Sequence, residues 1–436
     1  MHKHVLSVLF AIVLAACSSE SPSVPVTAPA VQDLNDVAKD YLVLELSMVA
    51  HDPSHVDAYF GPENLRLQAE QLQLGLAAIR ERATALQATL ATWPQYADDD
   101  LLGARIKGLQ ARVNALLTRV AMKQGETFTF DEESRRLFNA VAPDHDASYF
   151  EEILREIDAL LPGEGTTSDR VNQFYEQFEI PQERLAGVFD AAIQECRRRT
   201  LEHIQLTDNE SFSTEFVTDK PWSGYNWYQG NSTSLIQVNT DLPIKIERAI
   251  DLGCHEGYPG HHVFNLLLEE NLVNDQGWLE FSLYPLFSPM SLIAEGSGNY
   301  GIRLAFPDSD RIQFEKDVLF PLAGLNTDDA DRYYEILDLT KKLSYAGNEA
   351  ARDYLDGKTD REQAAAWLVR YALSSPERAR QRVSFFDTYR SYVINYNLGQ
   401  DMVANYVERG SADQAERWRR FAEILSSPTL PEDLRQ

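Results

Sequence analysis

Hydrophobic positions recur at helical spacing along most of the chain. Between residues 31 and 204 they return every three or four positions, which is the period of an amphipathic helix. The run from Leu65 to Leu90 is one example, and its apolar members are Leu65, Leu72, Leu76, Ile79, Leu86 and Leu90. Another long helix is predicted from Gln182 to Ile204, directly after Pro181, because proline is favoured at helix starts. We therefore expect this part of the molecule to be helical.

The pattern changes between residues 211 and 241. Several tryptophans and tyrosines precede Gly230-Asn231, a pair typical of turns, and an apolar run from Ser234 to Asn239 follows. These features predict a short β element. Helical periodicity then returns around residue 255, near Ser291 and from Asp308 to Pro428. The predicted fold class is mainly α, with a small β element at about residues 211–241.

The N-terminus has the features of an export signal. A short basic start precedes an apolar run from Val5 to Ala16, which is too short to span a bilayer. Cys17 follows Leu-Ala-Ala, which resembles the lipobox of bacterial lipoproteins. We expect a signal peptide over residues 1–16, a flexible tether over 17–30 and a single domain over 31–436. The lipid on Cys17 would hold this domain at the cell envelope, facing the periplasm and most simply at the outer membrane.

The charge balance argues against nucleic acid as a partner. The chain has 67 acidic against 40 basic residues, a formal charge of -27, which would repel a phosphate backbone. After Cys17 the cysteines are Cys196 and Cys254, too few for a disulfide framework. Whether these two form a single bridge stays open at this level.

Three histidines and one acid lie within eight residues, in the run His255-Glu256-Gly257-Tyr258-Pro259-Gly260-His261-His262. Zinc binds imidazole nitrogens and carboxylate oxygens, and hydrolytic zinc sites combine three protein ligands with a water molecule. We therefore predict one zinc ion, with His255 as a ligand and Glu256 as the general base. A structural zinc site is a weaker explanation, because such sites usually have four protein ligands.

The spacing of these histidines requires a broken helix. In the HExxH motif the second histidine follows four residues after the first, but here Pro259 occupies that position. In a straight helix His261 would lie roughly 120° away from the face of His255, and His262 about 10.5 Å along the axis. Proline lacks the amide hydrogen and Gly260 accepts unusual dihedral angles, so we expect a bulge or break before His261. That break favours His261 as the second ligand, with His262 as the alternative.

Glu295, on a following helix, is the predicted third ligand. A glutamate in that place is the arrangement of gluzincin metallopeptidases. The competing acids are Glu269, Glu270 and Glu280. Asn299 lies one turn after Glu295 and Asp251 one turn before His255, so both are candidates to hydrogen-bond a metal ligand.

The eight-residue motif, the run Leu-Ile-Gln-Val-Asn-Thr-Asp from Leu235 to Asp241 and the segment around Glu295 together resemble a bacterial family catalogued as domain of unknown function 885. The resemblance spans most of the chain. That family is grouped with the gluzincins, which implies a helical fold with two lobes around a deep cleft. It also implies that the histidine directly after Pro-Gly, here His261, is the ligand. Ser297 and Ile302 depart from the family pattern, which has Trp and Glu there.

The resemblance further implies residues that contact the substrate. In such clefts an edge strand, for which Ser234 to Asn239 is the candidate here, pairs with an extended peptide, and a tyrosine from the C-terminal helices supports the developing oxyanion. The candidates for substrate binding are Leu235, Gln237, Asn239 and Tyr300. The candidates for oxyanion support are Tyr392, Tyr396 and Arg390.

The predicted function is zinc-dependent hydrolysis of peptide bonds in short peptides by an envelope-anchored lipoprotein. One alternative is a lipoprotein that binds peptide or metal in a decayed cleft, for which the departures at Ser297 and Ile302 would be the reason. Another alternative is an amidase that acts on cell-wall peptides.

Overall fold

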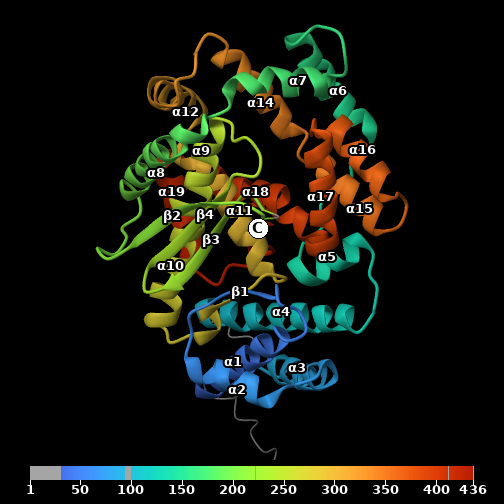
Figure 1. The fold of residues 1–436 in the computed structure, drawn as a ribbon. Helices are drawn as coiled ribbons and strands as arrows, with labels where there is room; N and C mark the ends of the chain where they lie inside the picture. Colours follow the sequence, from blue (N-terminus) through green and yellow to red (C-terminus); the bar gives the residue numbers. More distant parts are fainter. Residues whose placement is uncertain (1–30, 94–99, 221, 411, 436) are drawn as a thin grey trace, which may run out of the picture.

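Helices make up most of the protein, with a few short strands between them (Figure 1). The computed structural model describes residues 31–93, 100–220, 222–410 and 412–435. The predicted signal peptide, the lipidation site Cys17 and the tether lie outside these ranges. The mainly α fold class predicted from the hydrophobic pattern is confirmed. Over the described ranges, every helix is too short or too polar to cross a membrane.

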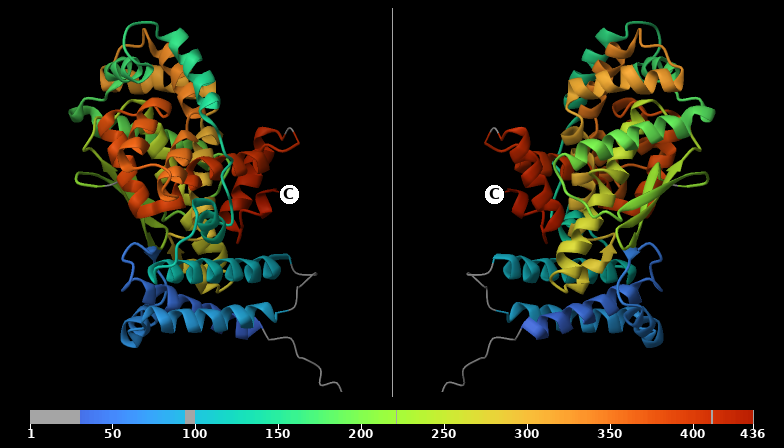
Figure 2. Two further views of the ribbon diagram at one scale, coloured as in Figure 1. Left: turned by 90° about the vertical axis from the view of Figure 1, so that its right-hand side faces the viewer. Right: turned by 90° about the vertical axis from the view of Figure 1, so that its left-hand side faces the viewer.

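Four N-terminal helices form a layer at one end of the molecule (Figure 2). They are α1 (Val31–Met48), α2 (Glu63–Leu72), α3 (Leu76–Ala91) and α4 (Asp100–Lys123). Ile79, Ala83 and Leu86 lie on one face of α3 and are buried against α1 and α4. The apolar run from Leu65 to Leu90 is thus two helices, because the chain turns at Gln73, which has a positive φ of 44°.

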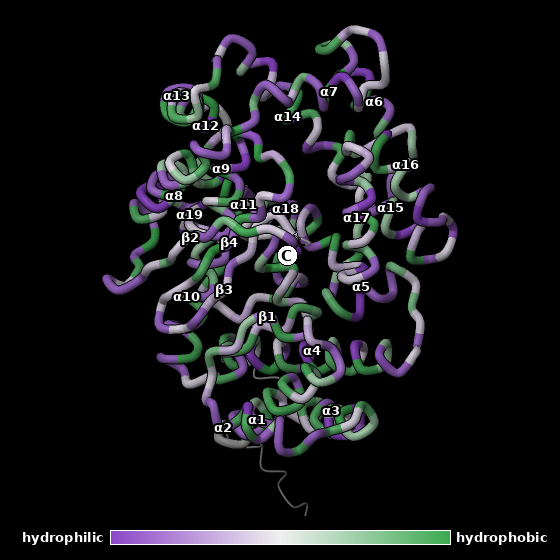
Figure 3. Tube along the Cα trace, in the orientation of Figure 1, coloured by the Kyte–Doolittle hydropathy of each residue, from purple (hydrophilic) through white to green (hydrophobic). Residues whose placement is uncertain are grey.

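The remaining helices fill the centre and the opposite end. They are α5 (Phe130–Phe138), α6 (Ala147–Leu160), α7 (Thr167–Tyr175), α8 (Leu185–Leu201), α9 (Glu247–Leu252), α10 (His261–Leu268), α11 (Pro289–Ala305), α12 (Asp308–Phe314), α13 (Phe320–Ala323), α14 (Ala330–Lys342), α15 (Ala346–Leu355), α16 (Arg361–Tyr371), α17 (Pro376–Tyr389), α18 (Ile394–Val407) and α19 (Gln414–Ser426). Hydrophobic and hydrophilic segments alternate along the outer helices (Figure 3), as expected for helices that bury one face. At the end opposite α1, Phe150 and Ile336 belong to a separate apolar cluster.

Two small sheets cross the middle of the molecule. In one, β1 (Val56–Tyr59) pairs with β5 (Leu283–Pro285). The other holds β2 (Ser211–Val217), β3 (Gly224–Gly230) and β4 (Thr233–Asn239) in the order β2-β4-β3. The β element predicted at residues 211–241 is therefore confirmed. The prediction that the last of these strands is an edge is wrong, because β4 pairs with β2 on one side and with β3 on the other.

Helices α11 and α18 touch through two glycines. A Cβ atom added to Gly296 of α11 would lie 2.4 Å from the backbone carbonyl carbon of Gly399 in α18. A Cβ atom at Gly399 would in turn lie 2.7 Å from the carbonyl oxygen of Leu292. Side chains at either position would force the helices apart, so the two backbones pack in direct contact.

A disulfide bond joins Cys196 of α8 to Cys254, the residue before His255. Both cysteines are fully buried. The sequence left open whether these two cysteines form a bridge, and the structure shows that they do. The bond links the start of the histidine motif covalently to α8.

Candidate metal centre

The histidine motif leaves the helical path between α9 and α10. After α9 the backbone forms a π-helical segment, Gly253–Gly257, and Tyr258 is then extended, with φ -119° and ψ 117°. The amide of Gly260 donates a hydrogen bond to the carbonyl of Cys254 at 3.0 Å, which closes the excursion. The next helix begins at His261. The break predicted from the Pro-Gly pair is confirmed.

This excursion depends on Gly260 having no side chain. A Cβ atom there would lie 1.8 Å from the carbonyl oxygen of His255 and 2.5 Å from that of Cys254. No other residue can approach the backbone so closely. As a result, the rings of His255 and His261 lie with their centroids 4.6 Å apart and nearly perpendicular, at 83°.

His255, His261 and Glu295 form a cluster whose potential ligand atoms all lie within 4.8 Å of one another. The Nε2 atoms of His255 and His261 lie 3.2 and 3.8 Å from the same Oε2 atom of Glu295. In a tetrahedral zinc site with bonds of 2.0–2.1 Å, the ligand atoms are separated by roughly 3.3 Å. Oε2 of Glu295 is buried and lacks a hydrogen-bond partner among the described residues. A divalent cation fits this set, because it would supply the missing partner.

Metal binding needs neutral imidazole and ionised carboxylate, and His261 and Glu295 meet this condition. Burial lowers the pKa of His261 to about 4, so this ring is neutral at neutral pH. Burial raises the pKa of Glu295, but the neighbouring His255 and His261 side chains and the Tyr392 hydroxyl outweigh it and hold the pKa below its usual value. Burial lowers the pKa of His255, yet Glu295 and Glu256 raise it above its usual value. The carboxylates of Glu295 and Glu256 thus favour a positive charge at His255. A bound metal ion would supply this charge and take the place of the proton.

Glu295 is oriented by its own helix and by Tyr392. The hydroxyl of Tyr392 donates a hydrogen bond to Oε1 of Glu295 at 2.7 Å. Tyr392 was a candidate for oxyanion support, and in the structure its hydroxyl is occupied by the Glu295 carboxylate. One turn after Glu295, a Cβ atom at Gly298 would lie 2.8 Å from Nδ1 of His255. The missing side chain lets α11 lie directly against the imidazole.

Glu256 is buried beside the cluster, with its carboxylate against β3. A Cβ atom at Gly224 would lie 2.9 Å from Oε1 of Glu256, and the Asn226 side chain donates to the Glu256 backbone carbonyl at 2.7 Å. Burial, with a further contribution from Glu295, raises the pKa of Glu256 to about 7. Within the described part of the chain this carboxylate has no ion pair and is free to exchange a proton near neutral pH.

The sequence analysis missed Asp57 and Tyr225, which lie close to these carboxylates. Asp57 of β1 accepts a hydrogen bond from the Tyr225 hydroxyl of β3. Burial raises the pKa of Asp57 to about 7, even though the Tyr225 hydrogen bond lowers it, and the charge of Glu295 adds to the rise. No local pattern around Asp57 marks it, because its position depends on the pairing of β1 with β5.

His262 is fully buried and both of its ring nitrogens are occupied. Nδ1 lies 2.8 Å from the Ser234 hydroxyl, and Nε2 lies 3.2 Å from Oε2 of Glu210. Glu210 also accepts a hydrogen bond from Tyr258. His262 as the alternative ligand is therefore wrong: it fastens α10 to the sheet instead.

The hydrogen bonds predicted for Asp251 and Asn299 are not formed. Asp251 is ion-paired with Arg311 at 2.8 Å, and the Asn299 side chain donates to the backbone carbonyl of Tyr396 at 2.9 Å. Nδ1 of His255 is buried and finds no hydrogen-bond partner in the ranges that the structure describes. The side chains of Asp251 and Asn299 thus bind neighbouring elements and do not hydrogen-bond the predicted metal ligands.

The competing acids are engaged elsewhere. Glu280 pairs with Arg105 at 2.6 Å in the buried layer next to α4. Glu269 accepts hydrogen bonds from the Tyr228 hydroxyl and from the amide of Asn231. Neither they nor Glu270 belong to the cluster with the histidines.

The side chains predicted to bind substrate on β4 point away from α10. Leu235, Gln237 and Asn239 lie on the half-exposed face of the strand, opposite the buried face where Ser234 meets His262. The Gln237 amide accepts a hydrogen bond from an exposed tryptophan and donates one to an exposed glutamate. Tyr225, which pairs with Gln237 in the register of β3 and β4, lies on the same face. Substrate binding by Leu235, Gln237 and Asn239 stays a prediction.

Three predicted residues near the C-terminal helices have different surroundings. Tyr300 is buried and its hydroxyl donates to Glu408 at 3.3 Å. Arg390 forms an ion pair with Glu133 at 2.7 Å. Both have structural partners, which argues against the predicted roles. Tyr396 is half-buried and has no hydrogen-bond partner for its hydroxyl within the described residues, while burial and the charge of Glu295 raise its pKa.

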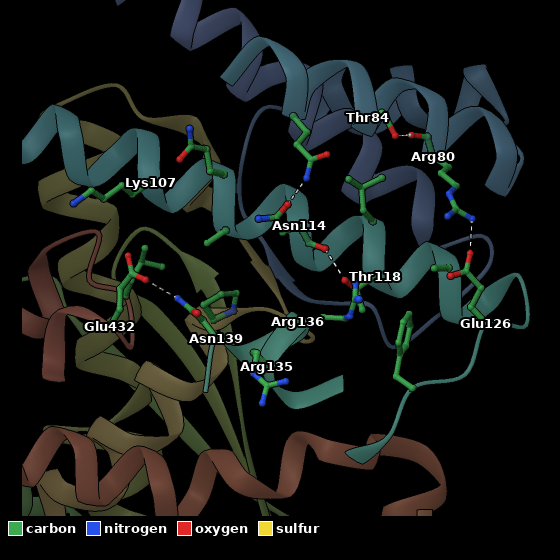
Figure 4. A pocket seen from close by; sticks show the side chains of 18 residues that line it. Arg80, Thr84, Lys107, Asn114, Thr118, Glu126, Arg135, Arg136, Asn139 and Glu432 are labelled. Atoms are coloured by element: carbon green, nitrogen blue, oxygen red, sulfur yellow. Dashed lines mark hydrogen bonds and ion pairs between the residues drawn. The ribbon is translucent and has the colours of Figure 1, made fainter. Parts of the chain in front are cut away.

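A cavity of about 660 Å³ lies elsewhere, between α3, α4 and α5 (Figure 4). Its wall is polar and includes an ion pair between Arg80 and Glu126 at 2.7 Å and a hydrogen bond from Asn139 to Glu432 at 3.2 Å. None of the predicted site residues lines it. The cluster of His255, His261 and Glu295 and this cavity thus lie in different parts of the molecule.

In sequence comparisons, no family model and no curated protein matches the chain. Its fold is similar to that of a candidate lipoprotein from Colwellia psychrerythraea, with a TM-score of 0.50 and 15% identity, over 87% of this chain and 76% of that one. A candidate lipoprotein of unknown function from Shewanella oneidensis has a TM-score of 0.47 and 13% identity, over 86% and 78% of the two chains. An M32 carboxypeptidase from Deinococcus radiodurans has a TM-score of 0.45 and 13% identity, over 92% and 94%. The first similarity shows a shared fold, and the resemblance to domain of unknown function 885 stays a prediction.

Proposed function

We propose that this protein is a zinc-dependent peptidase. The observation that carries the proposal is the unpartnered, buried Oε2 atom of Glu295 between the Nε2 atoms of His255 and His261, with the carboxylate of Glu256 beside them. Three protein ligands and an adjacent acid are the composition of a hydrolytic zinc site. A structural site would need a fourth ligand, and the described residues offer none in this cluster.

Each residue has a distinct role in the proposed reaction. His255, His261 and Glu295 would hold the zinc ion, which supplies Lewis acidity for the scissile carbonyl and for a water molecule. Glu256 takes the proton from that water and passes it to the leaving amine, and a pKa of about 7 suits both transfers. Tyr396, whose hydroxyl is unpartnered, donates to the carbonyl oxygen as negative charge develops there. Tyr392 keeps the Glu295 carboxylate in place.

We further propose that the enzyme acts on short peptides in the cell envelope. The basis is the lipobox-like sequence before Cys17 together with the family resemblance. If the protein instead cleaves cell-wall peptides, product mass spectrometry on short peptides and on muropeptides would separate the two substrate classes.

The variant Glu256→Gln tests the reaction. It keeps the size of the side chain and removes the base, so we expect hydrolysis to fall by ~10²–10⁴-fold while one zinc ion per chain is retained. Turnover of a mixed peptide library and elemental analysis measure the two quantities. Glu270→Gln, which removes an acid outside the cluster, is the matched control and should retain both.

Full activity in Glu256→Gln would contradict the proposal. Zinc bound by a wild-type protein that cleaves no peptide would instead favour a binding protein with a decayed site.

A further inference from the structure

Arg382 on α17 contacts aromatic rings but has no anionic partner within the part of the chain that the structure describes. Arg382 is half-buried. Unlike the other buried or half-buried arginines among the described residues, it makes neither an ion pair nor a hydrogen bond. In a chain with 67 acidic residues, the other arginines that are withdrawn from solvent have carboxylate or carbonyl partners, as Arg105 does with Glu280. Removing a charge from water without pairing it costs free energy. The position is therefore suited to an anion that arrives with a ligand.

Arg382 reaches the metal cluster through a row of aromatic side chains. Its guanidinium carbon lies 5.7 Å from the ring centroid of Tyr396, and the rings of Tyr396 and Tyr392 lie 5.8 Å apart. Tyr392 in turn donates its hydroxyl to Glu295. Burial lowers the pKa of Arg382, and the nearby Tyr396 and Glu295 raise it in part. The guanidinium is therefore close enough to Glu295 for an electrostatic interaction.

The rings of Tyr392 and Tyr396, 5.8 Å apart, lie between Glu295 and Arg382 in this row of contacts. Each residue of an extended chain spans ~3.3–3.6 Å, so a few peptide residues are enough to cover a separation of this order. The guanidinium carbon also lies 4.7 and 5.8 Å from the ring centroids of Phe385 and Phe386. A guanidinium that makes no hydrogen bond to the described residues keeps its N–H groups for a bidentate interaction with a carboxylate.

We propose that Arg382 binds a carboxylate of the substrate, namely the α-carboxylate at the C-terminus of the peptide. This inference rests on the proposed peptidase function and deepens it, because it makes the protein an enzyme that removes residues from the C-terminal end. An acidic side chain next to the scissile bond has the same chemistry and is the other source of the anion.

Three forms of one substrate distinguish these sources. N-acetylated pentapeptide libraries are made with a free C-terminal carboxylate, with a C-terminal amide, and with a C-terminal amide after a final glutamate. We expect the wild type to prefer the free carboxylate. In Arg382→Met, kcat/KM for that form should fall by ~10–100-fold, with little change for the plain amide. Arg382→Lys should restore part of the loss, because it keeps a charge but not the bidentate geometry.

The matched control is Arg380→Met. Arg380 is an exposed arginine of the same helix, 3.6 Å from Glu377, and its loss should leave all three rates unchanged. Thermal melting of each variant checks that the fold is kept. A preference for the amide with the final glutamate, lost in Arg382→Met, would overturn the assignment to the C-terminus.

Binding separates this inference from the proposed function. In zinc-loaded Glu256→Gln, calorimetry should show that the free-carboxylate library binds more tightly than the amide, and that adding Arg382→Met abolishes the difference. This result would support Arg382 even if the wild type hydrolysed nothing. Equal binding of the two forms, or an equal loss for both in the double variant, would overturn the inference.

Discussion

At the scale of single residues, the site depends on glycines that let backbone and imidazole approach. Gly260 lies so near the carbonyl of His255, and Gly298 so near its ring, that the next larger side chain would collide with the motif. These positions explain how an unusual histidine spacing still yields a pair of neighbouring rings.

We predict that Gly260→Ala destroys the metal site. Its methyl group would lie 1.8 Å from the His255 carbonyl oxygen, so the segment must shift and carry His261 away from Glu295. Zinc content should fall well below one ion per chain and peptide turnover by at least ~100-fold, as measured by elemental analysis and library hydrolysis.

Gly187→Ala is the control for this change. Gly187 lies within α8 with nothing within 4 Å of an added Cβ atom. Because alanine favours helix by up to ~1 kcal/mol over glycine, zinc content and turnover should be unchanged and stability equal or higher. Normal zinc binding in Gly260→Ala would show that the excursion is not what brings the histidines together.

At the scale of elements, the helical periodicity and the Pro-Gly pair predicted much of the fold and the broken motif helix. The strand order was not predictable in the same way, because β2 pairs in parallel with β4 and not with β3, which follows β2 in the chain. Individual site residues that depend on tertiary contacts were not predictable from the sequence either. His255 and Glu256 share one short motif, but Asp57 and Arg382 reach the site only through tertiary contacts that no local spacing records.

The bond between α8 and the motif segment leads to a stability prediction. Cys196 and Cys254 are 58 residues apart, and closing a loop of that length stabilises a fold by about 4 kcal/mol in the chain-entropy estimate. Replacing both by alanine should lower the free energy of unfolding by up to that amount, as measured in denaturant. A reductant should destabilise the wild type in the same way and leave the double variant unaffected. A wild type that ignores the reductant would contradict a stabilising role for the bond.

At the scale of the whole molecule, the described part of the chain begins with α1, in the layer opposite α7 and α14 (Figure 1). If Cys17 carries the lipid, residues 18–30 would link that layer to the membrane with a reach of at most ~45 Å. We predict that Cys17→Ser moves the protein from the membrane fraction to the periplasmic extract. Immunoblotting of the two fractions measures this change. The purified variant should keep its zinc and its turnover. Unchanged membrane association would show that another feature anchors the chain.

The contact between α11 and α18 has a consequence for how the protein matures. Glu295 is set on α11, whose path is fixed by a helix near the end of the chain. The position of Glu295 beside the two histidines therefore depends on α18 having folded. If the proposed zinc site and export are correct, a chain in transit would carry His255 and His261 without Glu295 in position, and would acquire zinc only in the compartment where its folding finishes.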